Sequence, residues 1–210
     1  MAPPFVVVLC HGSYHTPAPY QPLVDALTER GIETYCPQRP TCDLSQLNVG
    51  DINNPDFDRR APPGGYPLPA DDAAEIGRLI DRLISDGKSV LLAGHSSGGW
   101  VAAEAATSAR QASVRAQEGK TGGIIGIFFI GAFIIPEGQS VHSFFQPADG
   151  RVIAPPFMRF HVGLPPVILV EHALTVCRNT VLMALAQWSI LRNSSSMIST
   201  RRPLRNGRVR

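Results

Sequence analysis

The sequence predicts an α/β protein with a mostly parallel sheet and helices on both faces of that sheet. Three apolar runs of strand length, residues 5–10, 89–93 and 124–134, are separated by segments whose apolar residues recur at helical spacing. The first run is continuously apolar and rich in Val, which is typical of a strand covered on both faces, and the run at 124–134 is expected to be another buried strand. Strands that alternate with helices in this way join through right-handed crossovers into a parallel sheet.

The remaining elements follow from local patterns along the chain. We expect a helix over 20–27 that ends at Gly31, and a second helix over 71–84 that ends at Gly87. Residues 39–70 are rich in Pro, Gly, Asn and Asp and show no periodicity, so they predict a long irregular loop that lines a site. Two further elements are a short strand at 32–36 and a helix from about residue 98 to about Gln117.

The apolar run at 89–93 leads into Gly94-His95-Ser96-Ser97-Gly98 and then into an Ala-rich helix. In a Gly-x-Ser-x-Gly turn, small residues on either side let the chain reverse, so that the serine hydroxyl projects from the sheet. The pentapeptide alone is a weak signal, because a chain with 19 Gly residues can match it by chance. The strand before it and the helix after it make the signal specific. They predict a reactive Ser96 that faces the positive end of a helix.

Composition and charge exclude several classes of function. A length of 210 residues with 44% hydrophobic residues suits one globular domain. From residue 192 onward there are six arginines and no acid, and the rest of the chain has 13 basic and 17 acidic residues, so we expect no nucleic-acid surface. No apolar stretch has the length of a membrane span. We expect no metal and no dinucleotide cofactor, since neither ligand spacing nor a Gly-x-Gly-x-x-Gly motif is found.

The cysteines and the first residues indicate the compartment. No two of the four cysteines form a Cys-x-x-Cys pair, which favours a reduced intracellular protein. The apolar run at 5–10 is short and lacks a basic leader, so it predicts a strand rather than a signal peptide. The expected location is therefore cytoplasmic.

Three segments together resemble the α/β-hydrolase superfamily, and within it the small esterase-like members. They are residues 7–13, residues 94–99, and the apolar run at 124–134 that leads into Pro136-Glu137-Gly138. The resemblance covers roughly residues 4–157. It implies the α/β-hydrolase fold and acyl transfer, in which a serine attacks an ester or thioester of a small molecule and water later releases the acid.

The resemblance assigns roles to residues at two of these segments. Ser96 would be the catalytic nucleophile, and the backbone N–H groups of Ser13 and Ser97 would form the oxyanion hole. Three neighbouring residues are expected to contact the substrate: Gly12, His15 and His95.

The family also needs an acid and a histidine, in the chain order Ser, Asp or Glu, His. Residues 165–170 have the composition of a strand, with Glu171 as the candidate acid and His172 as the candidate base at its carboxyl end. Adjacent residues on a strand point to opposite faces, so both can face Ser96 only through an irregular turn. The alternatives are the acids Glu137 and Asp149 and the histidines His142 and His161.

The composition changes near residue 157, where the expected late strands are hard to find. We therefore predict an α/β-hydrolase core at 1–157, a divergent C-terminal helix and strand segment at 158–191, and a basic, disordered tail at 192–210. In this interpretation the C-terminal part is shortened or altered and lacks the last strands of the family.

Three functions remain open at this point. The first is a serine hydrolase that cleaves an ester or thioester through an acyl-enzyme. The second is a thioesterase or cyclase of secondary-metabolite biosynthesis, which activity confined to carrier-bound or CoA thioesters would distinguish. The third is a non-catalytic relative, or a truncated product, that acts as a binding protein; a folded protein with an unreactive Ser96 would indicate it.

Overall fold

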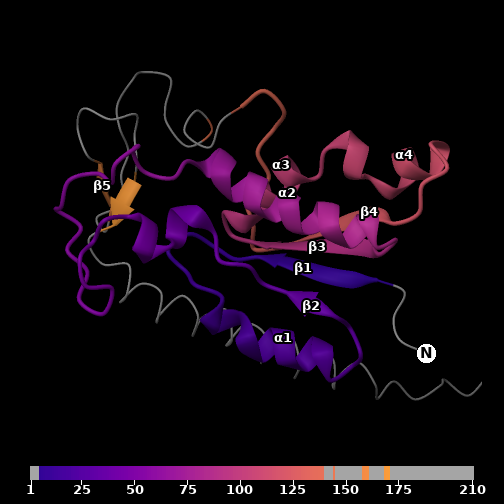
Figure 1. The fold of residues 1–210 in the computed structure, drawn as a ribbon, viewed down its shortest axis with the longest axis horizontal. Helices are drawn as coiled ribbons and strands as arrows, with labels where there is room; N and C mark the ends of the chain where they lie inside the picture. Colours follow the sequence, from indigo (N-terminus) through magenta and orange to yellow (C-terminus); the bar gives the residue numbers. More distant parts are fainter. Residues whose placement is uncertain (1–4, 140–143, 145–157, 161–167, 171–210) are drawn as a thin grey trace, which may run out of the picture. The chain divides into compact units, whose positions relative to one another are not determined.

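The fold is built on a parallel four-stranded sheet. The computed structural model describes residues 5–139, 144, 158–160 and 168–170. The strand order is β2-β1-β3-β4, and every neighbouring pair is parallel. The strands are β1 Val6–Cys10, β2 Thr34–Tyr35, β3 Ser89–His95 and β4 Gly123–Ile130 (Figure 1). The predicted parallel α/β architecture is confirmed.

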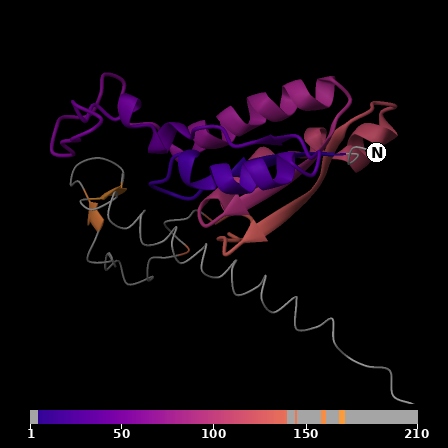
Figure 2. The same ribbon diagram turned by 90° about the horizontal axis from the view of Figure 1, so that it is seen from below.

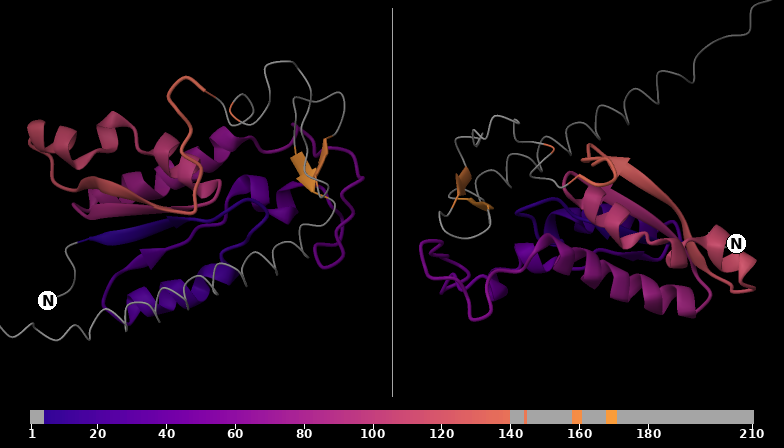
Figure 3. Two further views of the ribbon diagram at one scale, coloured as in Figure 1. Left: turned by 180° about the vertical axis from the view of Figure 1, so that it is seen from behind. Right: turned by 90° about the horizontal axis from the view of Figure 1, so that it is seen from above.

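Helices cover both faces of this sheet. The α-helices are α1 Gln21–Thr28, α2 Pro69–Ser85, α3 Gly98–Ala105 and α4 Ala112–Gln117. Helix α1 lies on one face, and α2 and α3 lie together on the other (Figures 1 and 2). Figure 3 shows the same layers from behind and from above.

The layers follow from the alternation of side chains along β1. Val6, Val8 and Cys10 pack in the larger core cluster with the apolar faces of α2 and α3. Val7 and Leu9 point to the opposite face, where partly buried residues of the α1 region pack against them. All five residues of β1 are buried, as the continuously apolar sequence predicts.

The long segment between β2 and α2 is irregular, as expected, apart from two short 3₁₀ helices at Pro40–Cys42 and Leu44–Gln46. Helix α2 begins at Pro69, where the fixed backbone angle of proline suits the first helical turn. The Asp71 side chain accepts a hydrogen bond from the Leu68 N–H group at 2.7 Å. Helix α2 therefore has a well-defined start.

The prediction of one helix from the turn to Gln117 is wrong. Helix α3 ends at Ala105, a 3₁₀ helix follows at Ser108–Arg110, and α4 begins at Ala112. Gln111 is extended and forms an isolated parallel bridge with Ile124 on β4. Arg110 Nη1 also donates to the Ala105 carbonyl at 3.0 Å, which satisfies a terminal acceptor of α3.

Strand β4 is shorter and less buried than predicted. It ends at Ile130, because Gly131 turns the chain at a φ of 50°. Among the described residues, β3 is the one strand that pairs with β4, so β4 forms the edge of the sheet apart from the single bridge between Ile124 and Gln111. As a result, Ile125 and Phe128 are exposed rather than buried. The predicted strand at 32–36 is likewise reduced to the two residues of β2.

A second, two-stranded sheet comes later in the chain. It pairs β5 Met158–Phe160 with β6 Ile168–Val170 in antiparallel fashion. The sequence predicted a strand at 165–170 but not its antiparallel partner. Residues 171–210, with the predicted tail, lie outside the described part of the chain, and the division at residue 157 stays a prediction. In the described residues, no helix combines the length and apolarity needed to cross a bilayer.

Candidate active site

The turn after β3 holds Ser96 in a conformation that non-glycine residues rarely adopt. Its φ is 53°, in the left-handed region, and strain of this kind costs ~1–3 kcal/mol unless the surroundings hold it. Three backbone hydrogen bonds do so. Ser96 N–H donates to the Ile130 carbonyl at 3.3 Å, and its own carbonyl accepts from Gly99 N–H at 3.1 Å and Phe133 N–H at 3.0 Å. The predicted sharp turn with a serine at its apex is present.

Close backbone contacts explain the glycines on either side of Ser96 and Ser97. A Cβ atom on Gly98 would lie 2.0 Å from the carbonyl oxygen of Cys10, the last residue of β1. A Cβ atom on Gly94 would lie 2.6 Å from the Gly99 Cα atom. The start of α3 therefore fits against the end of β1 only with glycine at position 98, and against the end of β3 only with glycine at position 94, which places the turn beside the loop that follows β1.

That loop and the turn bring together the residues predicted for the site. A Cβ atom on Gly12 would lie 3.2 Å from Ser96 Cβ, 3.1 Å from His95 Nδ1 and 3.4 Å from His15 Nδ1. Gly12, His15, His95 and Ser96 thus surround one point at the carboxyl ends of β1 and β3. Ligands of open α/β sheets bind at this end of the strands.

The two residues expected to form the oxyanion hole are also neighbours. Ser13 Oγ donates a hydrogen bond of 2.7 Å to Ser97 Oγ. Within the described residues, neither backbone N–H group donates to another group of the protein. The assignment of these two N–H groups to an oxyanion hole stays a prediction, and no protein acceptor among the described residues competes with it.

Tyr20 connects the histidines of the site, and the sequence did not indicate this role. Its hydroxyl oxygen accepts from Gly12 N–H at 2.9 Å and lies 2.6 Å from His15 Nδ1 and 2.7 Å from His95 Nδ1. The two imidazole rings stack with their centroids 5.8 Å apart. Tyr20 appeared in the sequence only as an apolar residue of helical periodicity.

Burial keeps these two imidazoles neutral. It lowers the pKa of His15 to about 4, with the neighbouring His95 adding to the effect, and it also lowers the pKa of His95. Tyr20 has one hydroxyl proton, so at most one imidazole accepts it and the other must donate its Nδ1–H. At least one neutral ring beside Ser96 therefore carries its lone pair on Nε2.

His11 is held differently and is fully buried. Its Nδ1 lies 3.0 Å from the Gly12 carbonyl, and its Nε2 accepts from the Arg39 backbone N–H at 3.2 Å. A neutral ring with its proton on Nδ1 satisfies both contacts. Burial lowers the pKa of His11 to about 4. Because both ring nitrogens are engaged, His11 orders the loop after β1.

A buried ion pair lies behind the turn. Arg39 and Asp72 are 2% and 0% exposed, and Arg39 Nη2 lies 2.7 Å from Asp72 Oδ2. The carboxylate also accepts from Arg39 Nε and from the backbone N–H and hydroxyl of Thr41. Sequence reasoning missed this pair, since it placed Arg39 in the irregular loop at 39–70 and Asp72 in the helix expected over 71–84.

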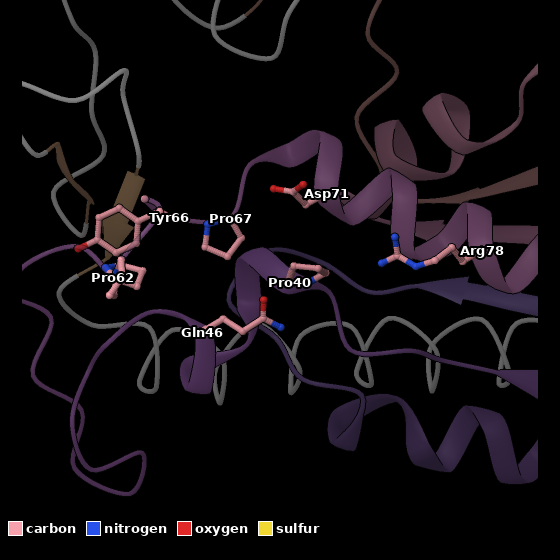
Figure 4. A pocket seen from close by; sticks show the side chains of 10 residues that line it. Pro40, Gln46, Pro62, Tyr66, Pro67, Asp71 and Arg78 are labelled. Atoms are coloured by element: carbon pink, nitrogen blue, oxygen red, sulfur yellow. The ribbon is translucent and has the colours of Figure 1, made fainter.

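The long loop between β2 and α2 borders a pocket of about 430 Å³ (Figure 4). Pro40, Gln46, Tyr66 and Asp71 are among the residues that line it, with Arg78 farther along α2. The lining includes none of the residues gathered around Ser96. The pocket beside this loop is therefore separate from the cluster of residues around Ser96.

The predicted acid and base lie outside the described residues, as do Asp149, His142 and His161. Glu137 is described and is exposed. Strand β6, which precedes Glu171 and His172, pairs with β5 in the antiparallel sheet, and the assignment of these two residues as acid and base stays a prediction. Among the described side chains, no group of His, Cys, Asp or Glu has the arrangement needed to hold a metal ion.

A family model agrees with this arrangement of sheet, turn and loop. The model of the alpha/beta hydrolase family matches residues 7–205. The chain belongs to this family. The turn after β3 and the loop after β1 are thus parts of an α/β hydrolase. No curated protein is significantly similar to this α/β hydrolase in sequence.

Several solved structures are similar to this α/β hydrolase. An extracellular α/β-hydrolase from a Paenibacillus species is 26% identical, with 70% of this chain and 48% of that one covered and a TM-score of 0.45. Tomato methylketone synthase I, complexed with 2-tridecanone, is 13% identical, with 87% and 65% covered and a TM-score of 0.54. The thioesterase RedJ from Streptomyces coelicolor is 18% identical, with 62% and 40% covered and a TM-score of 0.39.

At these identities the tomato structure supports the fold alone. The α/β hydrolase described here spans 65% or less of the length of each of the three structures.

Proposed function

We propose that this α/β hydrolase is a serine hydrolase that cleaves an ester or thioester of a small molecule through an acyl-enzyme on Ser96. The observation that carries the proposal is the left-handed conformation of Ser96 at the apex of the turn between β3 and α3. Strained residues of this kind concentrate at active sites, because the surrounding structure must hold them in place. The turn has the sequence and geometry of a nucleophile elbow.

The reaction would use groups that surround Ser96. Its Oγ attacks the carbonyl carbon while a histidine takes the hydroxyl proton, and a tetrahedral intermediate with a negative oxygen forms. The N–H groups of Ser13 and Ser97 donate to that oxygen. The bond to the alcohol or thiol then breaks, and the leaving group takes the proton. Water attacks the acyl-enzyme in the same way and releases the acid.

The general base in this proposal remains His172, oriented by Glu171, with His142 and His161 as alternatives. Among the described residues, His11 is unsuited to the role because both of its ring nitrogens already have partners. His15 and His95 lie beside Ser96, and we propose that they contact the substrate together with Gly12. No metal or organic cofactor enters this chemistry.

Covalent labelling with a fluorophosphonate tests the proposal directly, because the reagent reacts only with an activated serine. Intact mass spectrometry of the full chain should show one adduct. The adduct should be absent in Ser96→Ala and retained in Ser108→Ala, which removes the hydroxyl of an exposed serine. Substitution of His142, His161 and His172, one at a time, would then identify the base.

Two results would change the assignment. A folded protein that stays unlabelled would favour the alternative of a non-catalytic relative that binds a small molecule. Labelling together with turnover of CoA or carrier-bound thioesters, but not of simple esters, would favour the thioesterase or cyclase alternative.

A further inference from the structure

A single guanidinium group contacts both segments that carry the expected oxyanion hole, the loop after β1 and the elbow. Arg39 Nη1 donates to the His11 carbonyl at 2.7 Å and to Ser97 Oγ at 2.9 Å. His11 precedes Ser13 in the loop after β1, and Ser97 directly follows the expected nucleophile. One nitrogen atom therefore ties that loop to the elbow.

A pair of hydroxyl groups completes the connection. Ser13 Oγ donates to Ser97 Oγ, so Ser97 Oγ accepts from both Ser13 and Arg39. Ser97 is the N-cap residue of α3, yet its side chain makes no capping hydrogen bond. The Ser97 hydroxyl thus does not stabilise the helix end; it links two residues whose N–H groups face the expected oxyanion.

The guanidinium is itself fixed from the opposite side. Its Nε and Nη2 both donate to Asp72 Oδ2, at 3.0 Å and 2.7 Å. The Thr41 N–H group donates to Asp72 Oδ1 at 2.9 Å, and the Thr41 hydroxyl donates to Oδ2 at 2.7 Å. Because both charged side chains are buried and joined by two hydrogen bonds, Asp72 holds the guanidinium against the start of α2.

We propose that Arg39, held by Asp72, is a positioning residue that sets the spacing between the N–H groups of Ser13 and Ser97. The inference rests on the proposed function, since those groups matter for catalysis only in a hydrolase. Oxyanion donors act when they are preorganised at 2.7–3.1 Å from the developing charge. A looser spacing would weaken transition-state binding without changing how the substrate binds in its ground state.

Steady-state kinetics with p-nitrophenyl butyrate provide the first test. Arg39→Lys retains the charge but cannot reproduce the fork of donors, and we expect kcat to fall by roughly tenfold or more while KM stays within about twofold. Arg110→Lys is the matched control, because Arg110 makes a two-point pair with Asp81 and a hydrogen bond to the Ala105 carbonyl, away from the site. Its kcat should equal that of the wild type.

The serine variants keep the test decisive if Arg39→Lys fails to fold. Ser13→Ala and Ser97→Ala each break the hydroxyl bridge and leave the ion pair intact. If the bridge acts as a unit, each single change lowers kcat, and the double variant is no slower than the slower single variant. Single variants with wild-type kcat, or a double variant whose loss is the product of the two, would overturn the proposal.

A readout without catalysis separates this inference from the proposed function. If the wild type is neither labelled by fluorophosphonate nor active, the proposed function fails, and amide resonances in ¹H–¹⁵N spectra decide the positioning role. Arg39→Lys should shift the Ser13 and Ser97 cross-peaks well beyond the changes seen in Arg110→Lys. Unshifted cross-peaks in a folded Arg39→Lys protein would show that Arg39 does not position these residues.

Discussion

Helix α2 carries two Arg–Asp pairs whose partners have the same chemistry but different surroundings. Asp72, near the start of the helix, pairs with Arg39, and the two side chains are 0% and 3% exposed. Asp81, in its last turns, pairs with Arg110, and these side chains are 53% and 21% exposed. The closest N–O distances, 2.7 Å and 2.8 Å, are nearly equal. Distance alone therefore does not distinguish the two pairs.

The two Arg–Asp pairs differ in how far water reaches their charges. Water hydrates the charges of an exposed pair whether or not the two side chains meet, so such a pair contributes little to stability. Removing one partner of a buried pair leaves a charge that nothing solvates. The buried pair also contacts the loop after β1 and the elbow through Arg39, whereas Arg110 of the exposed pair donates a further hydrogen bond to the end of α3. The buried pair thus belongs to the candidate site, and the exposed pair belongs to the scaffold.

The largest expected effect is that of Asp72→Ala. The variant leaves the Arg39 guanidinium buried without its counter-charge, which should lower the free energy of unfolding by ~3–5 kcal/mol. Urea unfolding followed by circular dichroism measures the loss. A change below about 1 kcal/mol, typical of an exposed pair, would mean that the Asp72 site is open to water in solution.

Replacing both charged residues should restore part of this loss. In Arg39→Met/Asp72→Leu no buried charge remains, but the His11 carbonyl and the Thr41 N–H group lose partners, at ~1–3 kcal/mol for each such group. We expect the double variant to be more stable than Asp72→Ala, yet to keep the low kcat of Arg39→Lys. Unfolding curves and kinetics on the same samples separate stability from positioning. A double variant less stable than Asp72→Ala would contradict this account.

The buried histidine beside Arg39 predicts a pH dependence. The pKa of His11 is lowered to about 4, so the unfolded chain, with its ordinary value of 6.5, binds a proton more readily. The contribution to stability is full above pH 6.5 and is lost as the pH falls toward 4. At pH 5 the loss from His11 amounts to about 2 kcal/mol.

Thermal or urea unfolding at pH 5 and pH 7 measures this loss. The difference between the two pH values should shrink in His11→Asn, which removes the titrating group while its amide retains a donor and an acceptor. The remaining difference includes the contributions of His15, whose pKa is also lowered to about 4, and of His95, whose pKa is lowered by burial. An unchanged pH dependence in His11→Asn would show that His11 is not buried as a neutral ring.

The contrast between the pairs also shows what sequence patterns can and cannot predict. Strand β1, helix α2 and the elbow at Ser96 depend on hydrophobic periodicity and on glycines within a few residues, and all were predicted. The pairing of Arg39 with Asp72 joins residues 33 positions apart across an irregular loop. No local pattern marks Arg39 as different from a solvated loop arginine.

The same distinction holds for the other errors. Tyr20 has helical spacing, and only its contacts with Gly12 and the two histidines show its role in the site. The helix breaks after Ala105 because Gln111 adopts an extended conformation and forms a bridge with Ile124 of β4. Pairing with a distant strand here outweighs local helix propensity. Burial of β4 was overestimated because an apolar run does not show whether its strand has one neighbour or two.

The smallest expected effect is that of Asp81→Ala. Because the pair is exposed, the free energy of unfolding should change by only ~0.2–1 kcal/mol, and 1 M salt should remove most of that difference. Arg110 lowers the pKa of Asp81, so the contribution is present above the ordinary value of 3.8 and is lost as the pH falls below it. Urea unfolding at pH 7 and pH 3, with and without salt, measures these changes. A loss as large as that of Asp72→Ala would contradict the division between site and scaffold. A small, salt-sensitive loss beside a large, salt-insensitive one would support it, because salt screens only charges that water and ions can reach.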